Sequence, residues 1–95
     1  MANFRYYYVE IKKSQNTRDV VVTGEIINDT EKSFSTVGVR IILYVNNISV
    51  ANFVFTINGL SSRASKSFEK TVEELDYLQV GKNINRYDIY TETAF

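Results

Sequence analysis

The chain has 95 residues, of which 11 are basic and 11 are acidic, so its formal net charge is zero. It contains no cysteine and no histidine, which excludes disulfides and thiolate chemistry and removes the commonest general base and metal ligand. A balanced charge creates no field of one sign that would attract nucleic acid or an anionic membrane, and no apolar run is long enough to span a bilayer. The length predicts one domain over residues 1–95, either cytoplasmic or a piece of a longer secreted or anchored chain.

The N-terminal segment predicts a strand over residues 4–12, because aromatic and β-branched side chains alternate there with charged ones. We expect three odd-numbered side chains to face the core: Tyr7, Val9 and Ile11. Tyr6 and Tyr8 would then face outward. Packing on the sheet is the simpler interpretation of the tyrosine triplet, and a sticky aromatic platform for a sugar or a protein partner is the alternative.

A polar loop over residues 13–18 separates this strand from a second one over residues 19–28. One face of the second strand carries Val20, Val22, Gly24, Ile26 and Asn28. A glycine in the middle of a strand marks either a bulge or a place where another group packs close to the backbone. Residues 29–33 are polar and predict a solvated turn.

The longest apolar, β-branched run covers residues 37–45 and predicts a central strand. Its inward side chains would be Val37, Val39, Ile41 and Leu43, with Arg40, Ile42 and Tyr44 on the opposite face. Asn46-Asn47 follows and then a second strand-like run over residues 48–57. Two asparagines between two such runs predict a tight hairpin, since Asn tolerates positive φ.

The C-terminal third predicts two more strands. Asn58-Gly59 is a strong turn signal, and a Ser-rich stretch leads to a strand over residues 66–74, where Phe68 and Val72 lie amid charge, as expected of an edge strand. Residues 73–78 could form one helical turn, and a loop over residues 79–85 would precede the last strand, residues 87–95. One face of that strand would carry Tyr87, Ile89, Thr91 and Thr93. Short strands separated by turns indicate an antiparallel sandwich or a small barrel.

Four motifs then occur in a fixed order: Val22-x-Gly24-x-Ile26-x-Asn28, Ile41-Ile42-Leu43-Tyr44, Ile57-x-x-Leu60 and Phe68. Together they resemble the FxLYD domain family, over residues 20–68 of this chain. The sequence departs from the family pattern where Ile41 replaces the motif Phe, Val45 replaces the motif Asp, and Ser61-Ser62 replaces a common Pro-Gly.

The resemblance implies an all-β, immunoglobulin-like antiparallel β-sandwich of about six to seven strands. It also implies a module of prokaryotic cell-surface or membrane-anchored proteins with no established activity. Physically, Ile41 and Leu43 would fill the core, Gly24 would leave room for a bulky neighbour, and Asn28 would tie the turn at its strand end. Such residues determine folding, so the fold transfers with the resemblance and a function does not.

Few residues offer chemistry. The acidic run comprises Glu69, Glu73, Glu74 and Asp76, and we interpret it as a solvated charged strand and not as a catalytic pair. Asn28 begins a segment with oxygen ligands that lacks the pattern of a calcium loop, and both Asn28 and Asn47 fit the N-glycosylation acceptor pattern. We expect no catalytic residue, no cofactor, no metal and no nucleic-acid partner.

The leading hypothesis is therefore a non-catalytic module of the cell envelope or of an extracellular protein, acting as a spacer or a protein-interaction domain, with a second copy of itself among the potential partners. The alternative is a carbohydrate- or peptide-binding module that uses outward-facing Tyr6, Tyr8 and Tyr44. A hydrolase is a third hypothesis, and it requires buried acids where the pattern indicates exposed ones.

Overall fold

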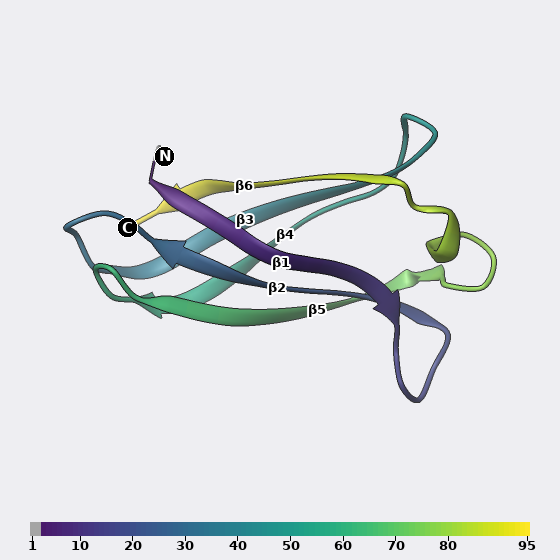
Figure 1. Ribbon diagram of the computed structural model, residues 1–95, viewed down its shortest axis with the longest axis horizontal. Helices are drawn as coiled ribbons and strands as arrows, with labels where there is room; N and C mark the ends of the chain where they lie inside the picture. Colours follow the sequence, from purple (N-terminus) through teal and green to yellow (C-terminus); the bar gives the residue numbers. More distant parts are fainter. Residues whose placement is uncertain (1–2) are drawn as a thin grey trace.

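The computed structural model describes residues 3–95, which form six β-strands and one short 3₁₀ helix, η1, Gly81–Asn83 (Figure 1). The strands are β1 Phe4–Lys13, β2 Asp19–Asn28, β3 Phe34–Val45, β4 Ile48–Leu60, β5 Ser65–Asp76 and β6 Arg86–Ala94. They build two three-stranded sheets, β1-β2-β5 and β4-β3-β6, in which every neighbouring pair is antiparallel. The predicted all-β sandwich is confirmed, and the strand orders match A-B-E and C′-C-F of immunoglobulin domains.

The predicted places of two strands within their sheets are also confirmed. β3 is the central strand of its sheet and β5 is an edge strand. Lys66 and Lys70 of β5 lie opposite Ile26 and Val22 of β2, so charged side chains share the core-facing side of this edge. Inward-pointing charges of this kind discourage another chain from adding to an edge strand.

The core lies between the sheets. Its fully buried side chains come mainly from β2 and β3: Val20, Val22, Ile26, Val37, Val39, Ile41 and Leu43. Phe68 of β5 is buried as predicted, while Phe55 of β4 is partly buried and packs against it with ring centroids 5.4 Å apart. Ile89 of β6 joins this core as expected, whereas Tyr87 is 40% exposed.

Gly24 is explained by the close approach of Phe68. A Cβ atom at position 24 would lie 2.7 Å from Phe68 Cζ, a distance at which something must shift. Gly24 pairs with Phe68 in a regular part of the β2–β5 ladder, and on its other side it faces the β1 bulge between Tyr7 and Glu10. It provides the room that the aromatic ring occupies in the core.

The hairpin between β3 and β4 confirms the Asn46-Asn47 prediction. Both asparagines have positive φ, 50° and 68°, the combination that a two-residue hairpin turn requires. The turn predicted at Asn58-Gly59 is wrong, because β4 continues through these residues to Leu60. Gly59 has φ of 75° within the strand, and the chain turns later, where the Ala64 N–H donates to the Ser61 carbonyl.

The helical turn predicted for residues 73–78 is also wrong. β5 continues to Asp76, and its register with β2 shifts so that Asp19 pairs with Asp76 and Val20 with Val72. This irregularity brings Leu75 into the core while the chain stays extended. The Asp76 carboxylate then accepts hydrogen bonds from the N–H groups of Leu78 and Gln79 and so forms the turn that ends the strand.

Two bulges alter the predicted faces of the outer strands. In β1 the register shifts between Tyr7 and Glu10, so Tyr6 packs against the core and Tyr7 does not, while Val9 and Ile11 face inward as predicted. In β6 the shift between Gly38 and Val39 of the partner strand places Thr93 beside Gly38 on the outer face and Ala94 against the core. A bulge reverses the alternation of every residue beyond it.

Asn3 and Phe95, the first and last residues that the structure describes, lie at one end of the sandwich, beside the β2–β3 connection (Figure 1). The Asp29 N–H donates to the Asn3 carbonyl, and Phe95 and Thr36 are joined by backbone hydrogen bonds. The opposite end of the molecule carries the β1–β2 loop, the β3–β4 hairpin and the segment that contains η1 (Figure 1). The sandwich is elongated, with principal extents of 43 × 28 × 19 Å. Its two ends carry different connections between strands.

Candidate functional site

The three tyrosines proposed as an interaction surface lie in different places. Tyr6 lies between the two sheets, Tyr8 lies on the bulge of edge strand β1, and Tyr44 lies on the outer face of the β4-β3-β6 sheet. They therefore do not form one aromatic platform.

Tyr6 was expected to face outward, and the structure contradicts this. Its ring packs against the core, and its hydroxyl forms a 2.5 Å hydrogen bond with Thr91 Oγ1 of β6. Burial raises the pKa of the Tyr6 hydroxyl above its usual value, although the hydrogen bond to Thr91 acts in the opposite direction. This side chain links β1 of one sheet to β6 of the other and contributes to the fold.

Tyr44 faces outward as expected, but it is engaged by its neighbours. Its hydroxyl donates a 2.9 Å hydrogen bond to Asp88, and the Arg86 guanidinium lies 3.9 Å from its ring centroid, a cation–π contact. The hydrogen bond to Asp88 raises the pKa of Tyr44, because the carboxylate favours the protonated hydroxyl. Arg86 therefore covers one face of the Tyr44 ring.

A second polar group lies on the same outer face. Arg40 of β3 forms an ion pair with Glu92 of β6 and donates to the side-chain oxygen of Asn52 on β4, so it connects all three strands. This contact lowers the pKa of Glu92 and raises that of Arg40, since each charged form is favoured by its partner. The Arg40–Glu92 pair therefore joins two neighbouring strands of the sheet.

Tyr8 is the most exposed of the three, with 79% of its surface accessible. Its φ is 55°, an uncommon value for a bulky residue. With Tyr7, Glu25 and Ile27 it lines an open cavity of about 160 Å³ on the outer face of the β1-β2-β5 sheet. Sequence reasoning missed this cavity because Tyr7 was placed inward.

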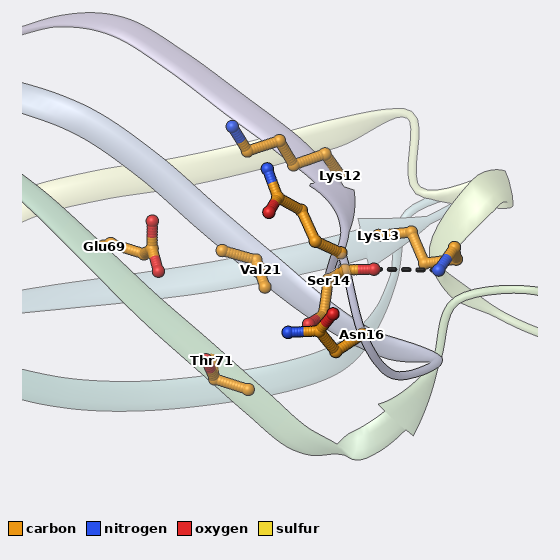
Figure 2. A pocket seen from close by; sticks show the side chains of 8 residues that line it. Lys12, Lys13, Ser14, Asn16, Val21, Glu69 and Thr71 are labelled. Atoms are coloured by element: carbon orange, nitrogen blue, oxygen red, sulfur yellow. Dashed lines mark hydrogen bonds between the residues drawn. The ribbon is translucent and has the colours of Figure 1, made fainter.

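A larger cavity of about 340 Å³ lies between the start of the β1–β2 loop and the outer face of the same sheet. Figure 2 shows Val21 between Glu69 and Thr71 of β5 on one side and the loop residues Ser14 and Asn16 on the other. The Lys13 ammonium holds the loop by donating to the carbonyls of Ser14 and Thr17, at 2.8 and 3.1 Å. The run Val20-Val21-Val22, which breaks the alternation of β2, was the only signal in the sequence that this outer face is covered.

The acidic run does not form a buried pair. Glu69, Glu73 and Glu74 are exposed, and Asp76 forms an ion pair with Arg18 at 2.9 Å. Within residues 3–95 no three metal-ligating side chains of the His, Cys, Asp and Glu types lie close enough to share an ion. In the same residues no helix has the length and apolar character needed to cross a membrane.

The two glycosylation acceptor patterns differ in accessibility. The Asn28 side chain is fully buried, and its amide nitrogen donates to the carbonyls of Lys32, Leu60 and Ser61. It ties two turns together, as the sequence predicted for its strand end. Asn47 is exposed at the tip of the β3–β4 hairpin.

Comparison of this chain with protein-family models, with curated proteins and with solved structures finds no match.

Proposed function

We propose that this chain is a non-catalytic β-sandwich module of a prokaryotic cell-envelope or extracellular protein, and that it acts in protein interaction. The resemblance of its motifs to the FxLYD family supports the location, and the sandwich is the fold that this resemblance implies. The polar side chains described above serve the fold: Asn28 ties turns, Tyr6 links the sheets, and Arg40 pairs with Glu92.

The position of the chain ends favours an interaction role over a spacer role. Asn3 and Phe95 lie beside the β2–β3 connection, so segments flanking this domain in a longer protein would leave from the same end. A domain attached in this way adds little of its 43 Å length to the distance between its neighbours. It instead presents its far end and its two outer faces to a partner. This placement of the ends is the observation that carries the proposal.

The carbohydrate- or peptide-binding alternative is favoured by one observation, the exposed ring of Tyr8. Tyr6 is engaged with Thr91 and Tyr44 lies under Arg86. A peptide ligand agrees with an interaction role, because an exposed tyrosine offers a rigid, amphipathic contact to a protein surface.

Protease treatment of intact source cells tests the proposed location. Peptides from this domain should be released before cell lysis, together with those of known surface proteins, and a cytoplasmic protein serves as the control. Peptides that appear only after lysis would contradict the envelope assignment.

Site-specific photo-crosslinking in the same cells tests the interaction. A crosslinking amino acid at positions 8, 46 and 90 of the full-length protein samples β1, the far-end hairpin and the outer face of β6 in turn. We expect a discrete protein adduct from at least one of these positions. Adducts from none of them would favour a passive domain without a partner.

A further inference from the structure

Tyr8 has a strained backbone conformation that is not offset by burial of its side chain. A non-glycine residue with φ of 55° has its Cβ close to the backbone carbonyl, and the ring gains little burial in exchange because 79% of the residue is exposed. The β1 bulge brings about this conformation by shifting the register between Tyr7 and Glu10. Strained residues of this kind cluster at binding sites, where the conformation positions a functional side chain.

The bulge places two aromatic rings beside a carboxylate. Tyr7 lies directly opposite Glu25 in the β1–β2 ladder, so their side chains share the outer face. The rings of Tyr7 and Tyr8 are 6.3 Å apart at an angle of 46° and form a corner. A cavity of about 160 Å³ is lined by Tyr7, Tyr8, Glu25 and Ile27. We name these four residues the Tyr8 pocket.

The chemistry of the Tyr8 pocket suits a compact cation. The face of an aromatic ring attracts a positive charge, and the Arg5 guanidinium already lies 5.5 Å from the Tyr7 ring centroid while it pairs with Asp29. Glu25 supplies a negative charge, is only partly exposed, and takes part in none of the ion pairs found among residues 3–95. Ile27 adds an apolar wall for the methylene groups of a side chain.

We propose that the Tyr8 pocket binds the ε-ammonium group of a lysine side chain on a partner protein. The ammonium would lie against the rings of Tyr7 and Tyr8 with Glu25 as its counter-ion, and the lysine methylenes would contact Ile27. The inference rests on the proposed interaction role and gives it a surface and a partner chemistry.

A titration followed by NMR tests this assignment on the ¹⁵N-labelled chain. The probe is the capped tripeptide acetyl-Gly-Lys-Gly-amide, and its neutral match has norleucine in place of lysine. We expect the lysine peptide to shift the amide resonances of residues 7, 8, 25 and 27 in a concentration-dependent manner. The norleucine peptide should shift them several-fold less, and added salt should weaken only the lysine response, because part of the attraction is between charges.

Two variants and one control locate the site. Tyr8→Ala and Glu25→Gln should each weaken the response to the lysine peptide by about 2- to 30-fold, the range that a cation–π or charge contact supplies. Tyr90→Ala removes an exposed tyrosine from the other sheet and should leave the response unchanged. Urea melts of each variant establish that it is folded.

Three outcomes would overturn the assignment. Equal responses to the lysine and norleucine peptides would show that charge is not recognised. An unchanged response in Tyr8→Ala would place the site elsewhere. Stronger binding of choline than of the lysine peptide would assign the Tyr8 pocket to a quaternary-ammonium ligand and not to a protein. These measurements use the isolated chain, so their failure is distinguishable from a failure of the cell-surface and crosslinking experiments.

Discussion

Asn28→Ala is expected to be one of the most damaging single changes in this chain. The side-chain amide is fully buried, and its nitrogen donates to the carbonyls of Lys32, Leu60 and Ser61 at 2.8, 3.2 and 3.2 Å. Its oxygen accepts hydrogen bonds from the N–H and the hydroxyl of Thr30, at 2.9 and 2.6 Å. One residue therefore holds the β2–β3 turn together and fastens it to the end of β4.

The magnitude follows from the groups that lose their partner. A buried polar group left without a hydrogen bond costs about 1–3 kcal/mol, and the carbonyl of Leu60, a buried residue, is poorly placed to recover a bond from water. Adding a partial loss at the more accessible turn groups gives about 3–5 kcal/mol for Asn28→Ala. A typical domain is stable by about 5–15 kcal/mol, so the variant should be close to unfolding.

Asn28→Asp gives a distinctive pH dependence. Burial and the facing carbonyls disfavour a charge here, so the introduced carboxyl should have a pKa raised above its unfolded value of about 3.9. A raised folded-state pKa means that this carboxyl destabilises the fold least below about pH 3.9, where it is protonated in both states, and that stability is lost as the pH rises through the folded-state pKa. Asn28→Ala has no such group and should show no such dependence.

Urea melts at several pH values measure both effects. Asn16→Ala and Asn16→Asp, in the exposed β1–β2 loop, are matched controls that should change stability by less than about 0.5 kcal/mol. An Asn28→Ala variant that melts like its Asn16 control would refute this account of the turn. So would an Asn28→Asp variant whose loss of stability relative to wild type is no smaller in acid than at neutral pH.

Leu43→Ala should cost about 2–5 kcal/mol, because Leu43 is fully buried and its loss leaves a cavity; Val45→Asp, at the partly exposed hairpin end, should cost much less, and urea melts in the reverse order would contradict the register of β3. Tyr8→Gly should leave stability unchanged or raise it by up to about 1 kcal/mol, since glycine adopts positive φ without strain; a clear loss in the same melts would show that the ring supports the fold. Tyr6→Phe should cost about 0.5–1.5 kcal/mol through its lost hydrogen bond to Thr91. Because burial raises the pKa of Tyr6, its neutral hydroxyl contributes fully below the unfolded pKa of about 10, and this stability is lost as the pH rises through the folded pKa. Wild type should therefore lose more stability than Tyr6→Phe in melts at alkaline pH, and equal losses would contradict the buried position.

The central strands could be predicted from the sequence because their environment is simple. β2 and β3 have a sheet neighbour on each side and the core on one face, so an apolar side chain recurs at every second position over most of each strand. The Asn46-Asn47 hairpin followed from backbone sterics alone, since few residues tolerate its φ angles. Gly24 could be recognised as a place of close packing, but only the tertiary structure identified Phe68 as the group that fills it.

The edge strands could not be predicted in the same way. Three consecutive tyrosines have equal strand propensity, so the sequence offers no preference between Tyr6 and Tyr7 for the core. The cross-sheet hydrogen bond to Thr91 satisfies the Tyr6 hydroxyl inside the molecule, and the bulge at Tyr8 then restores Val9 and Ile11 to the same face. Asn58-Gly59 misled for a similar reason, since positive φ at Gly59 serves a strand irregularity as well as a turn.

The sequence by itself determined the fold class, the core of β2 and β3 and the absence of thiol and imidazole chemistry, because these depend on composition and on the period of one strand at a time. The tertiary structure decided what the surface presents. The Tyr8 pocket exists because the β1–β2 register sets Tyr7 opposite Glu25 and the bulge places Tyr8 beside them. Residues 18 positions apart in the chain meet there only through strand pairing, and local periodicity contains no information about that pairing.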